Sequence, residues 1–310
     1  MPTRIPLARI PRPLALSLSM IVALVLSGCH PGNREAKRLI GSCNSGDPAA
    51  CNQLGEKLLV GQYILRDESR AADVFKQACD GRVGAGCTSL GTLYLRGQGV
   101  RRDSTLPPVL YRQGCDLGAL NGCTRLAVLH IQGLGVRRDS MRAVSLFQQA
   151  CHGGDLPGCA HLGMHHVSGD SASRDIARAT DLFQRSCAAK VPLGCLGLGR
   201  LHALGTGVPR NDSIAAELFK QACDGNEVAG CFQLAVVNEE GLGVAQNFQR
   251  AATLYREACG ERHAESCFKM AGLYERGAGV YRQPERATEM RRRACELGHI
   301  PACATKPGNS

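Results

Sequence analysis

The chain has 310 residues, of which 37 are Lys or Arg, 27 are Asp or Glu and 17 are Cys, and it contains no Trp. Hydrophobic residues make up 44% of the chain, which excludes a disordered polyelectrolyte and a polytopic membrane protein. Seventeen cysteines would be a liability in a reducing cytosol. The composition therefore favours either an oxidising compartment in which the thiols pair, or a metal-cluster protein, and the cysteine spacing must decide between them.

The first 28 residues have the pattern of an export signal. Three arginines in residues 1–12 precede an apolar segment over residues 14–26, which is too short for a comfortable membrane span. The ending Leu-Ser-Gly-Cys at residues 26–29 resembles the bacterial lipoprotein lipobox. This resemblance implies that Cys29 is acylated and becomes the first residue of the mature chain. The alternative is an ordinary signal peptide with an incidental cysteine.

The residues after Cys29 indicate where the mature chain would be held. His30 stands where an Asp would favour inner-membrane retention in enteric bacteria, so we expect an outer-membrane anchor facing the periplasm or the cell surface. Residues 29–33 would be a short tether that keeps the body close to the bilayer. Removal of residues 1–28 takes away three arginines and no acid and leaves a net charge of +7. This modest charge, without an aromatic-interleaved basic patch, argues against a nucleic-acid partner.

The other sixteen cysteines form eight C-x7-C pairs that recur every 36 residues. A constant period of this size predicts a solenoid of helical hairpins. We divide the chain into an N-terminal half-repeat (34–48), seven repeats (49–300) and a C-terminal stub (301–310). The pairs are Cys43/Cys51, Cys79/Cys87, Cys115/Cys123, Cys151/Cys159, Cys187/Cys195, Cys223/Cys231, Cys259/Cys267 and Cys295/Cys303.

The first helix of each repeat has apolar residues at helical spacing, and its seventh position is always small. A small residue there lets another helix approach closely. A G-x-G sequence then ends this helix in most repeats, because Gly adopts the left-handed conformation at little cost. We do not interpret G-x-G as a nucleotide loop, since no strand precedes it. The small column is Gly55, Gly91, Ala127, Gly163, Gly199, Ala235 and Ala271.

The second helix of each repeat opens at an Asp or Asn, whose side chain is a good N-cap. It then places Ala, an aromatic residue and Cys at i, i+4 and i+8, as in Ala71, Phe75 and Cys79. In the last repeat Arg291 replaces the aromatic residue, as expected of a terminal repeat with less to bury. The predicted caps are Asp67, Asp103, Asp139, Asp175, Asn211 and Asn247.

Each cysteine pair joins the end of a second helix to the start of the next first helix across a short turn. Two antiparallel helices that meet there bring the Cα atoms within bridging range. Zinc sites need several sulfurs close to one ion, whereas each pair here offers two and the next pair is 36 residues away. We therefore expect eight structural disulfides and no metal.

The repeat motif (A/G)-C-x-x-L-(G/A), G-x-G-V-x-x-D and A-A-x-L-F-x-x-A-C resembles the Sel-one-like repeat, a relative of the tetratricopeptide repeat. The C-x7-C pair in each unit and the export signal resemble the Helicobacter-type cysteine-rich (Hcp-like) subfamily over about residues 34–303. The resemblance implies an all-α fold, a right-handed α/α solenoid of 36-residue hairpins. It also implies an adaptor or scaffold function, or, as described for some subfamily members, penicillin binding or weak β-lactamase activity.

The residues offer little support for an enzyme. A serine β-lactamase needs an activated serine, and its usual motifs are S-x-x-K, S-D-N and K-T-G. The chain has one S-x-x-K, at Ser266 and Lys269, and neither of the other two. Ser266 falls in a column of glycines, so a coincidental small residue is the favoured interpretation. His161 and His165, at i and i+4, would offer two metal ligands but have no evident third. We expect no catalytic residue, cofactor or metal.

Two columns of residues 36 positions apart are candidates for binding. The first, which we call the polar column, suits hydrogen bonding and stacking on an extended partner, although a semi-buried packing column is the alternative. The second is an arginine column that would accept an acidic partner or remain a solvated face. The polar column is Tyr94, His130, His166, His202, Asn238 and Tyr274, and the arginine column is Arg70, Arg142, Arg178, Arg250 and Arg286.

These observations favour a non-catalytic envelope lipoprotein that binds a protein or a peptidoglycan-like envelope polymer through a concave repeat surface. The alternative is a β-lactam-binding or β-lactam-hydrolysing protein. The repeat at 157–192 departs most from the pattern, with Gly-Asp-Ser-Ala-Ser at residues 169–173 where other repeats have G-x-G-V. That irregularity is either a recognition site or neutral drift.

Overall fold

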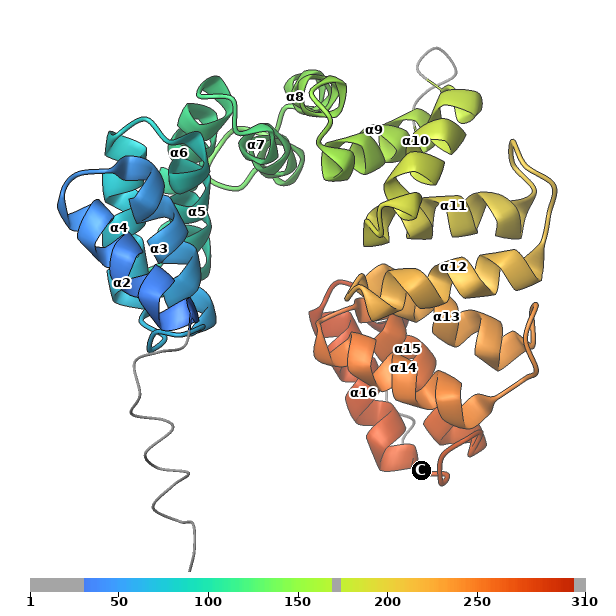
Figure 1. Ribbon diagram of the computed structural model, residues 1–310. Helices are drawn as coiled ribbons and strands as arrows, with labels where there is room; N and C mark the ends of the chain where they lie inside the picture. The colour runs from blue at the N-terminus through green and yellow to red at the C-terminus, as the bar shows by residue number, and fades with distance from the viewer. Residues whose placement is uncertain (1–30, 169–173, 304–310) are drawn as a thin grey trace, which may run out of the picture. The chain divides into compact units, whose positions relative to one another are not determined.

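The computed structural model of the chain describes residues 31–168 and 174–303. The export signal, Cys29, the irregular segment 169–173 and residues 304–310 lie outside the described residues. The described part contains sixteen helices and no strand, which confirms the all-α repeat array (Figure 1). Within it, no helix is long and apolar enough to cross a membrane.

The chain divides into two compact units, residues 1–102 and 103–310. The helices of unit 1 are α2 (Pro31–Asn44), α3 (Pro48–Val60), α4 (Glu68–Asp80) and α5 (Gly84–Arg96). Those of unit 2 are α6 (Leu106–Asp116), α7 (Leu120–Gln132), α8 (Ser140–His152), α9 (Leu156–Ser168), α10 (Ile176–Ala188), α11 (Pro192–Leu204), α12 (Asp212–Asp224), α13 (Val228–Glu240), α14 (Phe248–Gly260), α15 (Ala264–Arg276), α16 (Pro284–Glu296) and α17 (Ile300–Cys303).

The odd-numbered helices from α3 to α15 are the first helices of the repeats, and the even-numbered helices that follow them are the second helices. In each unit a helix packs against the one that follows it along the chain (Figure 1). First helices also pack against first helices of the next repeat, α3 on α5 in unit 1 and α7, α9, α11 and α13 in turn in unit 2. The contact of a second helix with the next first helix is thus the main one between repeats, and the contacts between first helices add to it.

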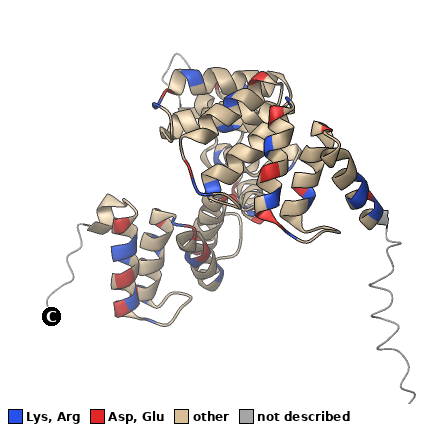
Figure 2. Cartoon of the chain, turned by 90° about the vertical axis from the view of Figure 1, so that its left-hand side faces the viewer, with Lys and Arg blue, Asp and Glu red and all other residues tan. Residues whose placement is uncertain are grey.

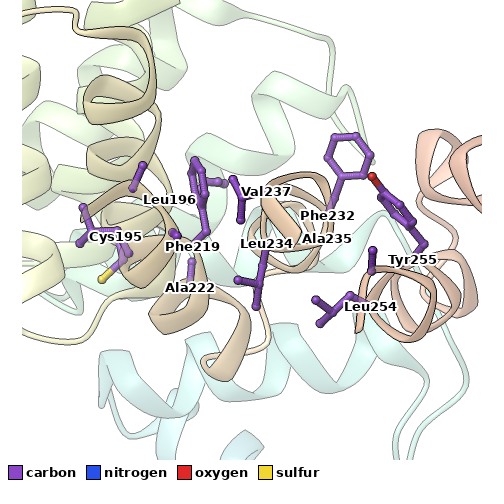
Figure 3. Packing of buried hydrophobic residues seen from close by; sticks show 14 of the residues in the cluster. Cys195, Leu196, Phe219, Ala222, Phe232, Leu234, Ala235, Val237, Leu254 and Tyr255 are labelled. Atoms are coloured by element: carbon purple, nitrogen blue, oxygen red, sulfur yellow. The ribbon is translucent and has the colours of Figure 1, made fainter. Parts of the chain in front are cut away.

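The small column of the first helix receives the aromatic ring of the second helix. A Cβ on Gly163 would lie 2.7 Å from a ring carbon of Phe183, and one on Gly199 would lie 2.7 Å from a ring carbon of Phe219. The rings of Phe183 and Phe219 are completely or almost completely buried. Figure 3 shows this packing in unit 2, where Phe219 lies close to Val237 of the next first helix. The prediction of close approach at this column is confirmed.

The glycines after the first helix have two different roles. The first glycine of G-x-G caps the helix in the left-handed conformation, as predicted, with φ of 73° at Gly241. The second glycine lies against the start of the preceding second helix, a role that was not predicted from the sequence. A Cβ on Gly243 would lie 2.2 Å from the carbonyl carbon of Asp212. No side chain fits there without movement of the backbone.

Five of the six predicted N-caps are confirmed, since the side chains of Asp67, Asp139, Asp175, Asn211 and Asn247 accept from a backbone N–H three residues ahead. The prediction that Asp103 is the N-cap residue is wrong in position. Helix α6 begins at Leu106, and its N-cap is Thr105. Pro107 and Pro108 have no N–H to donate to the carbonyls of residues 103 and 104, so the helix starts two residues late. From outside the cap position, Asp103 Oδ1 accepts from the Thr105 N–H at 2.6 Å and from the Leu106 N–H, the first of the helix, at 3.3 Å.

All eight cysteine pairs are disulfides, with Cα–Cα distances from 4.4 to 4.9 Å. Each of the first seven joins the end of a second helix or of α2 to the next first helix, and the eighth joins α16 to α17. Two cysteines of one hairpin, such as Cys51 and Cys79, are thus not bonded to each other, and the bridges link successive hairpins. The bridges are Cys43–Cys51, Cys79–Cys87, Cys115–Cys123, Cys151–Cys159, Cys187–Cys195, Cys223–Cys231, Cys259–Cys267 and Cys295–Cys303.

The second cysteine of a bridge differs in exposure from one junction to another, which the common spacing does not reveal. Cys51 of α3 and Cys267 of α15 are buried, whereas Cys231 of α13 is half-buried. The Sγ atom of each lies 3.6 to 3.7 Å from the carbonyl oxygen of the cysteine to which it is bonded. These contacts are not hydrogen bonds, because a disulfide sulfur carries no proton to donate. The disulfides are therefore packed into the junctions between hairpins, and the junction at α13 is the more open of these three.

Candidate functional site

The polar column lies near the end of each first helix, at the same place in every repeat. In the five members from His130 to Tyr274, the backbone carbonyl accepts from the N–H of the residue that caps the following second helix. This bond runs from Asp139 to His130, from Asn211 to His202 and from Gln283 to Tyr274, each at 3.0 Å. The column therefore sits beside the loop that joins the two helices of a hairpin.

The side chains of the polar column differ in exposure and in partners. His130, Asn238 and Tyr274 are buried, and Tyr94, His166 and His202 are half-buried. Asn238 Nδ2 donates to the Leu234 carbonyl at 2.8 Å. His202 Nδ1 donates to the Pro209 carbonyl at 3.2 Å. The semi-buried packing role weighed from the sequence thus describes part of the column.

Three members of the polar column, all in unit 2, also line surface pockets. The pocket volumes are about 520 Å³ at His130, about 560 Å³ at His166 and about 670 Å³ at Tyr274. Each pocket also includes a residue of the preceding second helix at one repeat register, namely Arg112, Gln148 and Arg256. A pocket therefore recurs at the same repeat position three times. Each lies where a first helix meets the second helix that precedes it.

Arginines give these pockets a basic character. Arg178 of the arginine column lines the His166 pocket, with its Nε 3.6 Å from an Asp175 carboxylate oxygen. Arg286 lines the Tyr274 pocket, where its guanidinium carbon is 5.9 Å from the centre of the Tyr274 ring. The lining of the Tyr274 pocket contains two arginines and no acid. Arg112 and Arg256 were not predicted as site residues, although their spacing of 144 residues is four repeats.

We call this set of three pockets, with the column residues that line them, the binding strip. Basic and acidic residues are both spread along the helices of the molecule (Figure 2). The binding strip differs from this mixed surface because its linings contain more arginines than acids. The arrangement suits hydrogen bonding and ion pairing with a partner that carries carboxylates.

Ser266, the one candidate nucleophile, is completely buried at the start of α15. Its hydroxyl donates to His263 Nδ1 at 2.8 Å, and the Ser266 N–H donates to the same atom at 3.3 Å. His263 is the N-cap of α15, and burial lowers the pKa of its imidazole. The pair therefore has the geometry of a helix cap, and a β-lactam has no access to the Ser266 hydroxyl.

His161, the first of the two candidate metal ligands, stacks on Phe147 with a ring-centre distance of 4.7 Å. Burial lowers the pKa of His161, because the charged imidazolium is poorly solvated there. His165 lies near His166, with ring centres 6.1 Å apart. In residues 31–168 and 174–303, no three His, Cys, Asp or Glu side chains are grouped so as to hold a metal ion.

The comparison with protein families identifies the repeat. A Sel1 repeat model matches residues 48–82, 84–106, 120–155, 156–191, 192–227, 228–262 and 264–299. The matches cover more than half of the chain, and the chain belongs to the Sel1 repeat family. The family resemblance stated from the sequence is thus confirmed. No functionally curated protein matches the chain in sequence.

Solved structures with similar folds come from several bacteria. A protective antigen of uropathogenic Escherichia coli with an SLR fold is 25% identical, with a TM-score of 0.56, and the match covers 86% of this chain and 57% of that one. A Sel1 repeat protein from Oxalobacter formigenes is 23% identical, with a TM-score of 0.58 and coverage of 74% and 99%. Cysteine rich protein B of Helicobacter pylori is 26% identical, with a TM-score of 0.35 and coverage of 44% and 98%.

The disulfides place the folded chain in an oxidising environment. Eight bridges in one chain are typical of extracytoplasmic proteins, because cytosolic thiols are kept reduced.

Proposed function

We propose that the chain is an exported, lipid-anchored scaffold that binds a protein partner along the binding strip and performs no chemistry itself. The observation that carries the proposal is the recurrence of a pocket at one repeat position, with a polar-column residue in each. Proteins of the Sel1 repeat family generally bind protein partners. A repeat array suits this function, because one kind of contact is presented several times along the chain.

The anchor and the domain limits are part of this proposal. Signal cleavage before Cys29 and acylation of Cys29 would leave residues 29–33 as a tether, followed by the half-repeat at 34–48, the repeats at 49–300 and the stub at 301–310. Several acyl chains on one terminus anchor a protein stably, whereas a single chain is marginal. Outer-membrane attachment would place the binding strip in the periplasm or at the cell surface.

The test is capture of envelope proteins by the oxidised mature chain, compared with a variant in which Arg256 and Arg286 are both changed to Gln. We expect the variant to lose the captured protein, because both guanidiniums line the Tyr274 pocket. Arg262→Gln is the matched control, since Arg262 is exposed in the turn after α14. Equal capture by all three proteins would contradict the proposal.

Two further arms of this experiment separate the alternatives. In the first arm, the chain is sedimented with peptidoglycan sacculi. Co-sedimentation that is lost in Arg256→Gln/Arg286→Gln, with no protein captured, would identify the partner as an envelope polymer and not a protein. Turnover of a chromogenic cephalosporin would move the chain to the enzyme class. No contact of the described residues favours that second activity, since Ser266 is enclosed in a helix cap.

A further inference from the structure

The pocket at His130 differs from the other two in the number of arginines at its surface. Arg112 comes from α6, and Arg137 and Arg138 come from the loop between α7 and α8. All three are exposed, and within the described part of the chain none is in an ion pair or a side-chain hydrogen bond. The carboxylate in the lining, Asp139, is the N-cap of α8 and accepts from the Arg142 N–H at 2.9 Å. The pocket therefore has a local excess of positive charge.

His130 lines the same pocket and carries a buried hydrogen-bonding atom. Its side chain is 6% exposed, and its Nδ1 donates to the Arg137 carbonyl at 3.3 Å. In the neutral ring this leaves a lone pair on Nε2. Nε2 is buried and has no hydrogen-bond partner. A buried polar atom without a partner is costly, so an opening of the pocket that lets a ligand donor reach Nε2 would gain that hydrogen bond.

The pocket thus presents three guanidiniums for anions and one acceptor for a donor. An acidic peptide carries both complements, because its side chains are carboxylates and its backbone supplies N–H groups. A fully ionised phosphate satisfies the guanidiniums but has no donor for His130 Nε2. We propose that the His130 pocket binds an acidic segment of a partner protein, with carboxylates on Arg112, Arg137 and Arg138 and a backbone N–H on His130 Nε2. This assignment rests on the proposed function, since it specifies the partner chemistry at one pocket of the binding strip.

The repeat at His202 offers an internal comparison. His202 Nδ1 donates to the Pro209 carbonyl as His130 Nδ1 does to the Arg137 carbonyl. The residue equivalent to Arg138 is Arg210, whose Nε and Nη2 each donate to an Asp212 carboxylate oxygen at 3.1 Å. The residues equivalent to Arg112 and Arg137 are Gln184 and Pro209. The His202 repeat keeps the imidazole and lacks the unpaired charge, so Arg210 provides a matched control.

The test uses the oxidised mature chain and two fluorescein-labelled peptides, one of alternating Asp and Ala and one of alternating Asn and Ala, with anisotropy as the readout. We expect the Asp peptide to bind at least about tenfold more tightly, with binding that weakens as salt is added. Arg112→Gln and Arg138→Gln should each weaken binding about three- to tenfold, and Arg210→Gln should change it less than about twofold. The Asp peptide should also shift the ¹⁵N resonance of His130 Nε2.

The outcomes separate this assignment from the proposed function. Equal binding of both peptides, or equal losses in Arg138→Gln and Arg210→Gln, would overturn the acidic-peptide site. Displacement of the Asp peptide by inorganic phosphate at matched charge would show a general anion site and would also overturn it. If these arms fail while partner capture still depends on Arg256 and Arg286, the proposed function stands and this assignment falls. Failure of both experiments would refute the proposed function and the acidic-peptide site together.

Discussion

At the residue scale, the second glycine of G-x-G connects neighbouring repeats through backbone contact. Gly243 has φ of 70° and lies against the carbonyl of Asp212, at the start of the preceding second helix. Gly207 has nearly the same φ, 72°, but a Cβ there would meet the Ile176 Cγ2 methyl, the end of a side chain. The two positions share their conformational demand and differ in whether backbone or a side chain must move.

This difference predicts unequal costs for one substitution. Gly207→Ala should destabilise the protein by about 1–2 kcal/mol, the usual penalty for a left-handed non-glycine residue. Gly243→Ala should destabilise the protein by about 1–3 kcal/mol more than Gly207→Ala does, because the new methyl forces the backbone apart. Urea unfolding of the oxidised proteins, followed by circular dichroism, measures both values. Equal free energies of unfolding for the two variants would show that the backbone contact at Gly243 has no energetic weight.

The buried imidazole of His263 should make the stability of the protein depend on pH. Burial lowers the pKa of its imidazole below the ordinary value of 6.5, so the unfolded chain binds the proton more tightly than the folded chain. Stability should therefore be unaffected by this group above about pH 6.5 and should fall as the pH drops towards the lowered pKa. Protonation of Nδ1 would also remove the acceptor for the Ser266 N–H and hydroxyl.

His263→Asn tests this prediction, because Asn is a good N-cap that does not titrate. The loss of stability between about pH 7.5 and about pH 5 should be smaller in the variant than in the parent, as measured by urea midpoints. Some loss should remain, since burial also lowers the pKa of His161. An unchanged pH profile in the variant would rule out His263 as a source of acid sensitivity.

The last repeat keeps a hydrogen bond where it loses an aromatic ring. In the sixth repeat the Tyr255 hydroxyl donates to Glu239 Oε2 at 2.7 Å. One repeat later Arg291 replaces the tyrosine, and its Nη2 donates to Glu275 Oε2 at 2.7 Å. The sequence predicted that Arg291 marks a terminal repeat with less to bury. The retained acid could not be recognised as its partner, because that pairing depends on side-chain positions.

At the element scale, the disulfides fix the junctions between hairpins. Each bridge joins cysteines eight positions apart, and in the chain-entropy model closing such a loop contributes about 2.5 kcal/mol. Cys187 and Cys195 of the fifth bridge are buried between α10 and α11, whereas Cys303 of the last bridge is exposed on α17. The effect of removing a bridge should therefore depend on its position in the array.

We expect Cys187→Ala/Cys195→Ala to lower the free energy of unfolding by about 2.5 kcal/mol or more, because hairpins on both sides of the junction lose support. Cys295→Ala/Cys303→Ala should mainly release α17. Hydrogen exchange under oxidising conditions distinguishes the two, with faster exchange in α10 to α12 in the first variant and in α16 and α17 in the second. The same local pattern in both variants would contradict a role for the bridges at individual junctions.

The elements that the sequence predicted well are those set by local chemistry and by the period. The disulfide pairing, the small column and five of the N-caps all follow from residue types at fixed spacing. The start of α6 was wrong, since the capping signal at Asp103 was followed while the missing N–H groups of Pro107 and Pro108 were overlooked. Contacts between repeats, such as Gly243 on Asp212, depend on the packing of whole hairpins and were not foreseen.

At the scale of the whole molecule, the candidate site is formed by two hairpins together and not by one column of residues. The polar column was identified from its period, but the pockets also require residues of the preceding second helix, such as Arg112 and Arg256. Their contribution follows from the three-dimensional register between hairpins. The column also mixes functions, since Asn238 is buried and bonded to its own helix while Tyr274 lines a pocket.

The measurement that tests the central claim most directly is site-specific photo-cross-linking in cells. A benzophenone amino acid would replace Gln148 and Tyr281, which are exposed and line two pockets of the binding strip, and, as a control, Glu261, which is exposed in the turn after α14. The account predicts a cross-linked protein partner from Gln148 and Tyr281 and none from Glu261. Cross-links from the control position alone, or from no position, would contradict the claim that this strip binds a protein.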